Sequence, residues 1–134
     1  MYGIDINRMA VDNAKRFTGF DVVEGNVFKL PFRDNYFDLV FTDGLLIHIN
    51  PDDLVDAMSE IYRVSNYYVM GIEYYDKVMK MIRYHGLDNV LWKGNYCDIY
   101  QKHFGLVLLA KKKLCYKDSD NVDMAFLLKR EDTT

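Results

Sequence analysis

Residues that cross-link or interrupt a chain are scarce in this sequence. Of its 134 residues, only two are cysteine and two are proline. Cys97 and Cys115 lack the CxxC spacing, so a disulfide framework and a zinc site are not expected, and reduced thiols in a cytoplasmic protein are the natural interpretation. Because no Pro- or Ser-rich linker divides the chain, residues 1–134 are expected to form a single domain.

An excess of positive charge is also missing. The chain carries 17 Lys and Arg residues against 20 Asp and Glu residues, which gives a net charge of −3. Nucleic-acid binding relies on a basic surface that meets phosphates, so a nucleic-acid partner is not expected. No run approaches the roughly 18 apolar residues of a membrane span, and the N-terminus lacks a signal-peptide pattern. The sequence therefore predicts no membrane association, and it contains no spacing typical of a metal site.

What the sequence does contain is a set of well-marked helix ends. Asn7, Asn50 and Asn95 are each suited to cap a helix, because a short polar side chain accepts hydrogen bonds from the first free backbone N–H groups. Gly19 and Gly105 follow as natural helix stops. The predicted helices span residues 8–18, 51–64 and 96–104. The first helix is expected to place four apolar residues near one face, and these are Met9, Ala10, Ala14 and Phe17.

Short apolar runs around these helices predict strands over residues 2–7, 21–24, 37–42 and 67–74. Strands that alternate with helices predict a parallel sheet with helices packed on it. After residues 77–94, which are expected to be irregular or partly helical, two longer strands over 106–116 and 122–129 flank a short polar turn. That pattern predicts an antiparallel hairpin. The predicted fold class is therefore α/β, with a mostly parallel sheet and a C-terminal antiparallel hairpin.

Four blocks along this pattern stand out by their order and spacing: GIDIN at residues 3–7, GNVFKLPF at 25–32, FDLVF at 37–41 and LLIHI at 45–49. Together they resemble the second strand, the adenine-binding turn, the fourth strand and the segment after it in class I methyltransferases that use S-adenosylmethionine (SAM), of the type 11 kind. The resemblance implies a Rossmann-like sheet. Three further segments are similar to methylases associated with pseudaminic acid biosynthesis: EYY at 73–75, RYHG at 83–86 and the closing hairpin.

The resemblance implies a set of residues that bind SAM. Asp5, at the end of the first strand, would accept hydrogen bonds from the ribose hydroxyls, although it could also cap the helix that follows. Asn26 stands where the family usually has Asp, so it would meet the adenine amino group without a full negative charge, and it could equally shape only a turn. Asp43 has the same alternative, as a turn former. The implied cofactor-binding residues are Asp5, Ile6, Asn26, Val27, Asp43 and Gly44.

The implied chemistry is methyl transfer to a small polar acceptor, with a sugar or sugar nucleotide as the expected substrate class. Such a transfer mainly requires that donor and acceptor be aligned, and a base is needed only when the acceptor must lose a proton. His48 is the first candidate for that base, with Glu73 and His85 after it. A lone histidine is also often a structural residue, and Glu73 could be an ordinary acid at a strand end. The candidate catalytic residues are His48 and Glu73, and the candidate substrate-binding residues are Tyr74, Tyr75, Tyr84 and His85.

Members of this family carry a first strand, a glycine-rich loop and a helix ahead of the block at residues 3–7. The chain is therefore expected to be a partial domain that lacks them, with an incomplete SAM site. Since that first strand lies between the second and fourth strands, a homodimer or a strand-completing partner chain is expected. The alternatives to an active enzyme are a non-catalytic binding or interaction module and one half of a split enzyme. A Rossmann-like oxidoreductase is a weaker alternative, because the hairpin and the block at 45–49 count against it.

Overall fold

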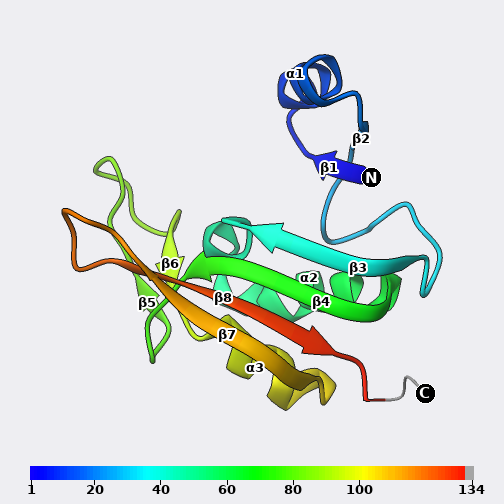
Figure 1. Cartoon of the computed structure of the whole chain (residues 1–134). Coiled ribbons are helices and arrows are strands. Elements are labelled where there is room, and N and C mark those ends of the chain that lie inside the picture. The colour runs from blue at the N-terminus through cyan, green and yellow to red at the C-terminus, as the bar shows by residue number, and fades with distance from the viewer. Residues whose placement is uncertain (132–134) are drawn as a thin grey trace.

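The chain begins with a small βαβ unit. The computed structural model describes residues 1–131, in which β1 (Tyr2–Asp5) and β2 (Asp21–Glu24) pair in parallel and α1 (Arg8–Thr18) connects them (Figure 1). The predicted ends of α1 are confirmed, because the Asn7 side chain accepts a hydrogen bond from the Ala10 amide and Gly19 ends the helix at a φ of 69°. Positive φ is a conformation that glycine adopts without steric cost.

Only part of the expected apolar face of α1 is buried. Val11 is the residue of this helix that is fully buried, whereas the side chains of Met9 and Phe17 are 73% and 81% exposed. The reason is the small size of the surface beneath the helix. Two four-residue strands cover only the part of α1 that contains Ala10, Val11 and Ala14, so the more distant apolar side chains have nothing to pack against.

The larger part of the fold is a four-stranded sheet with the order β3-β4-β8-β7. The pair β3–β4 is parallel, and β8 runs antiparallel to both of its neighbours, β4 and β7. The closing hairpin is therefore confirmed, as are the strands that precede it. The bounds are Phe37–Asp43 for β3, Ser65–Tyr74 for β4, Val107–Cys115 for β7 and Val122–Lys129 for β8.

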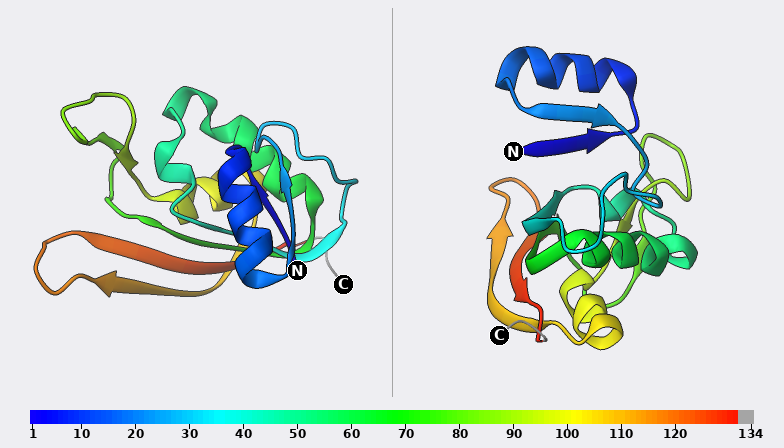
Figure 2. Two further views of the ribbon diagram at one scale, coloured as in Figure 1. Left: turned by 90° about the horizontal axis from the view of Figure 1, so that it is seen from above. Right: turned by 90° about the vertical axis from the view of Figure 1, so that its right-hand side faces the viewer.

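Two helices cover one face of this sheet. These are α2 (Pro51–Val64), capped by the Asn50 side chain, and α3 (Tyr96–Phe104), capped by Asn95 and ended by Gly105 as predicted. Figure 2 shows both helices on the same side of the strands, and no helix of the described residues covers the opposite face of the sheet. The core lies between these helices and the sheet, where apolar burial stabilises the fold. Its largest fully buried apolar side chains are Leu46, Met58, Ile61, Val69, Tyr100 and Leu128.

The connection between β4 and α3 is largely irregular, which is one of the two alternatives expected from the sequence. Residues 77–94 contain no helix; instead β5 (Lys80–Met81) and β6 (Trp92–Lys93) form a short antiparallel pair. Between them, His85, Gly86 and Asn89 all have positive φ, which is incompatible with a right-handed helix. The preceding β3–α2 connection holds a single turn of 3-10 helix, η1 (Leu46–His48).

The two sheets do not join. In the described part of the chain, no strand pairs with the outer edge of β3, and β1 runs across the direction of β3 rather than beside it (Figure 2). An aromatic cluster connects the two sheets instead. The ring of Tyr2 lies 6.2 Å from Phe32, 6.2 Å from Tyr36 and 5.5 Å from Phe37, measured between ring centroids. The predicted parallel pairs therefore exist, but they belong to separate sheets.

Candidate functional site

A cavity of about 570 Å³ lies at the carboxyl ends of β3 and β4. Ligand sites of open α/β sheets form at this edge, because neighbouring parallel strands end there and their connections leave in different directions. Here β3 leads into η1, and β4 leads toward β5. A cavity of this size is within the range of small-molecule sites.

Side-chain alternation along β4 decides which of its residues reach the cavity. Ile72 and Tyr74 line it, whereas Glu73 between them points toward the helices and is 1% exposed. The Glu73 carboxylate accepts hydrogen bonds from the Thr42 hydroxyl at 2.7 Å and from the Leu46 amide at 2.9 Å. Burial nevertheless raises the pKa of Glu73 to about 7, because desolvation of the charge outweighs these donors.

His48 reaches the cavity from η1. Gly44, at a φ of 64°, turns the chain directly after β3, and its amide donates to the Ile72 carbonyl at 2.9 Å. The imidazole Nδ1 of His48 lies 3.1 Å from the carbonyl oxygen of Val90. Because a carbonyl only accepts hydrogen bonds, Nδ1 carries the proton in the neutral ring, and Nε2 is left with a lone pair that can take up a proton.

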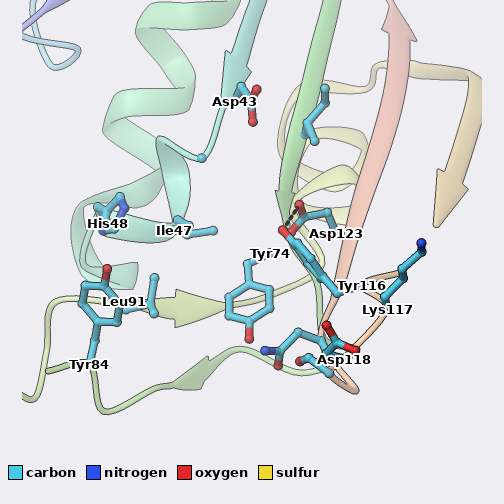
Figure 3. A pocket seen from close by; sticks show the side chains of 14 residues that line it. Asp43, Ile47, His48, Tyr74, Tyr84, Leu91, Tyr116, Lys117, Asp118 and Asp123 are labelled. Carbon is cyan, nitrogen blue, oxygen red and sulfur yellow. Dashed lines mark hydrogen bonds between the residues drawn. The ribbon is translucent and has the colours of Figure 1, made fainter. Parts of the chain in front are cut away.

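The β7–β8 hairpin supplies the opposite wall. In Figure 3, His48 and Tyr84 lie on one side, Tyr116 and Asp118 on the other, and Tyr74 between them. The Tyr116 hydroxyl donates to the Asp123 carboxylate at 2.6 Å, and this hydrogen bond raises the pKa of Tyr116.

A lysine fixes this wall in place. The ammonium group of Lys93 donates to the Asn121 side chain at 2.9 Å and lies 4.4 Å above the ring of Tyr74. The sequence indicates only a polar turn at residues 118–121, and it does not indicate that these residues line the cavity. The carboxylate, hydroxyl and amide groups concentrated in this turn are a sequence signal for a binding site. The sequence does not show, however, that the turn lies beside the end of β4.

Of the residues predicted for the site, the cavity brings five together: Asp43, Gly44, His48, Tyr74 and Tyr84. Three others lie nearby without lining it. Glu73 is buried beneath η1, the Tyr75 ring has the Lys113 ammonium 5.6 Å from its centroid, and the His85 ring packs 4.1 Å from that of Tyr84. Their roles toward a substrate stay predictions.

The four remaining cofactor candidates lie outside the cavity, in and after β1 and β2. One oxygen of Asp5 accepts from the Asn7 amide at 2.9 Å, and the side-chain oxygen of Asn26 accepts from the Phe28 amide at 2.8 Å. Ile6 is 72% exposed, and Val27 packs against the edge of the core. Asn26 thus shapes a turn, while a cofactor role for these residues stays a prediction.

Comparison with known proteins supports the fold class. The sequence family described as a methyltransferase domain matches residues 1–67, half of the chain. No curated protein matches significantly. A solved protein of Pyrococcus horikoshii OT3 has 18% identity and a TM-score of 0.73, covering 98% of this chain and 71% of its own.

Two further structures are similar. The Burkholderia thailandensis 1,6-didemethyltoxoflavin-N1-methyltransferase, solved with 1,6-didemethyltoxoflavin and S-adenosylhomocysteine (SAH), has 12% identity and a TM-score of 0.75 over 98% of this chain and 61% of its own. A SAM-dependent methyltransferase from Methanosarcina mazei has 14% identity and a TM-score of 0.71 over 96% of this chain and 81% of its own. At these identities the likeness shows the fold, and the predicted Rossmann-like α/β class is confirmed.

Proposed function

Since the chain belongs to the methyltransferase domain family, we propose that it takes part in SAM-dependent methyl transfer to a small polar acceptor bound in the cavity at the carboxyl ends of β3 and β4. The observation that carries this proposal is the geometry of His48. Its ring is held by the Val90 carbonyl at Nδ1, which leaves Nε2 as the nitrogen that can accept a proton, and His48 lines the cavity. A group that accepts a proton beside a ligand cavity is what an acceptor hydroxyl or ammonium requires before methylation.

The residues of the cavity suit a positively charged cofactor. SAM supplies an electrophilic methyl group on a cationic sulfur. Asp43, Asp118 and Asp123 line the cavity together with a single ammonium group, that of Lys117, so carboxylates are in excess. Asp43 and Gly44 would lie beside the cofactor, and Asp5, which retains a second carboxylate oxygen, would accept from the ribose hydroxyls. The solved Burkholderia enzyme holds SAH, which is in keeping with this cofactor.

The walls of the cavity suit a sugar or a sugar nucleotide as the acceptor. Tyr74, Tyr84 and Tyr116 offer aromatic faces to the apolar side of a sugar ring, and Ser119 and Asn121 offer groups that hydrogen-bond with hydroxyls. The similarity of residues 73–75 and 83–86 to methylases of pseudaminic acid biosynthesis supports the same substrate class. Proximity and orientation in such a pocket can supply roughly 7–11 kcal/mol of the barrier lowering.

Calorimetric titration of the pure chain with SAH and with SAM tests this function. Micromolar binding supports it, and the absence of binding at millimolar ligand ends the proposal for this chain acting alone. His48→Asn then isolates the proton acceptor, because Asn keeps a side-chain N–H near the Nδ1 position but has no counterpart of Nε2. We expect this variant to retain SAH binding and to lose methyl transfer to candidate sugar acceptors.

A second candidate is a non-catalytic interaction module, or one half of a split enzyme. It is favoured by the separation of the two sheets, because the outer edge of β3 is unpaired within the described residues. On this strand, the side chains of Leu39 and Phe41 are 43% and 48% exposed. Such an edge can pair with a strand of a second copy or of another chain. Light scattering after size-exclusion chromatography distinguishes these states, and a monomer at high concentration would argue against a strand partner.

Two further properties belong to this proposal. Cys97 is buried, Cys115 is exposed, and both are free thiols, which suits the reducing cytoplasm. None of the helices in residues 1–131 has the length and apolar character needed to cross a membrane.

A further inference from the structure

Glu73 is the one acidic side chain that is fully buried in the described part of the chain. It lies near the end of β4, where its carboxylate meets donors from two other segments. The Thr42 hydroxyl of β3 donates to Oε2 at 2.7 Å, and the amides of Leu45 and Leu46 donate at 3.4 and 2.9 Å. Both carboxylate oxygens are therefore used, and two of the three donors are backbone groups of the turn that leads into η1.

The same turn carries His48. The His48 amide donates to the Leu45 carbonyl at 3.1 Å, and the His48 ring is bonded to the Val90 carbonyl at 3.1 Å. A continuous series of hydrogen bonds thus runs from the Glu73 carboxylate through Leu45 to the backbone of His48. The turn is also held by the burial of Leu46 and by the Gly44 amide, but the N-cap of the three-residue η1, Leu45, has no side-chain cap, so the amides of Leu45 and Leu46 depend on Glu73 for an acceptor.

The described surroundings of Glu73 offer its carboxylate hydrogen-bond donors but no opposite charge, and burial raises its pKa. The hydroxyls of Tyr96 and Tyr100, on α3, are buried and have no hydrogen-bond partner in the described residues. Burial raises the pKa of each tyrosine, and the negative charge of Glu73 raises it further. On the remaining side, Glu73 pairs with the apolar Met124 of β8. Within residues 1–131, no basic side chain pairs with the Glu73 carboxylate, so backbone and hydroxyl donors hold it.

A buried carboxylate is a costly way to stabilise a fold, because its desolvation offsets much of what its hydrogen bonds contribute. What it supplies is geometry: a single acceptor group that draws the Leu45 and Leu46 amides toward β4. We propose that Glu73 is a positioning residue, whose carboxylate fixes the turn before His48 and thereby sets the place of the His48 ring in the cavity. What this positioning of the turn means for catalysis rests on the proposed function, whereas the experiment that tests the positioning does not.

The test compares wild type with Glu73→Gln by nuclear magnetic resonance on the ligand-free chain. Gln has nearly the same shape but only one accepting oxygen, so it cannot accept from both the Leu45 amide, which bonds Oε2, and the Leu46 amide, which bonds Oε1. Hydrogen exchange at Leu45 and Leu46 reports the turn, and exchange at Val69, in the centre of the sheet, reports global opening. Imidazole nitrogen shifts report the His48 tautomer, and Glu131→Gln is the matched control at an exposed position.

Loss of one hydrogen bond to a charged group corresponds to roughly a ten- to hundredfold change in equilibrium. We expect exchange at Leu45 and Leu46 to rise by that factor in Glu73→Gln, beyond any rise at Val69, and the His48 ring to become a mixture of tautomers. Equal rises at all three amides, or an unchanged His48 spectrum, would overturn the proposal and leave Glu73 a purely structural residue.

Glu73→Asp is the second variant, and it keeps the test decisive if Gln prevents folding. It preserves the ionisable group but withdraws it from the turn by one methylene, so the same local increase in exchange is expected. The SAH titration is a separate measurement on the wild-type chain. SAH binding can therefore fail while Glu73 still controls the turn, and Glu73 can fail as a positioning residue in a chain that binds SAH.

Discussion

Replacement of Arg63 by Met should destabilise the segment that connects the two sheets. The guanidinium of Arg63, on α2, donates to both oxygens of Glu60 at 2.8 and 2.9 Å and to the backbone carbonyls of Phe32 at 2.7 Å and Leu30 at 3.0 Å. It also meets the carboxylate of Asp34 at 2.9 Å. One side chain therefore holds residues 30–34 against α2, close to the aromatic cluster of Tyr2.

The expected magnitude follows from the exposure of each partner. The Asp34 side chain is 73% exposed, so its ion pair contributes almost nothing. The forked pair with Glu60 is less exposed, at 31% and 19% for the two side chains, and contributes on the order of 1 kcal/mol. Each charge-assisted bond to a carbonyl adds on the order of 1 kcal/mol. We therefore expect Arg63→Met to lower the free energy of unfolding by about 3 kcal/mol.

Urea unfolding followed by circular dichroism measures this change. A loss of about 3 kcal/mol lowers the midpoint by on the order of 1–2 M urea for a domain of this size. Arg63→Lys is the matched variant, because it keeps the charge but loses the planar fork, and it should restore less than half of the loss. Asp34→Asn should cost under about 0.5 kcal/mol.

The pH dependence gives an independent check. The hydrogen bond from Arg63 holds the pKa of Glu60 below its usual range, so its stabilising effect is present above the unfolded pKa and is lost as pH falls through the lowered, folded value. The difference between wild type and Arg63→Met should therefore be constant at neutral pH and shrink in acid. A cost below about 1 kcal/mol, or one matched by Asp34→Asn, would refute this account of the segment.

Three further expectations concern the sheet, its buried acid and the cavity wall. A methyl group at Gly71 would collide with the ring of Phe126, so Gly71→Ala should cost about 1–3 kcal/mol in thermal or urea unfolding, and Phe126→Leu should recover part of it in the double variant. Because burial raises the pKa of Glu73 to about 7, wild-type stability should fall by roughly 3 kcal/mol as pH rises from about 4.5 through 7, and Glu73→Gln should remove that slope. Lys93→Met should weaken SAH binding measured by calorimetry, whereas Lys113→Met, which removes a similar ammonium–tyrosine contact outside the cavity, should leave it unchanged.

Local signals in the sequence were sufficient for most elements of the fold. All three helices begin after the predicted asparagine, since capping depends on a side chain and a backbone group only a few residues apart. The closing hairpin follows from two apolar runs around a short polar turn. The segment 77–94 is harder, because His85, Gly86 and Asn89 have positive φ and so exclude a helix there. Such residue types adopt positive φ more readily than others, but the sequence does not show which of them do so.

The candidate site likewise has one part that the sequence predicts and another that it does not. Asp43, Gly44 and His48 are close in sequence at the end of one strand, so their shared position could be predicted. Tyr116 and Asp123 could not, because only the register of β8 against β4 brings the hairpin turn to the cavity. Glu73 shows the limit most clearly. Its neighbours Ile72 and Tyr74 face the cavity, and the strand's two-residue alternation turns the carboxylate to the buried side.

The sequence by itself determined the α/β class, the helix boundaries and the strand end that carries His48, because these depend on contacts a few residues apart. Only the tertiary structure decided that β1 and β2 form a sheet of their own, that the hairpin completes the cavity, and that Glu73 lies under the turn before His48. Each of these depends on how distant segments share the available surface and hydrogen-bonding groups, which no local pattern encodes.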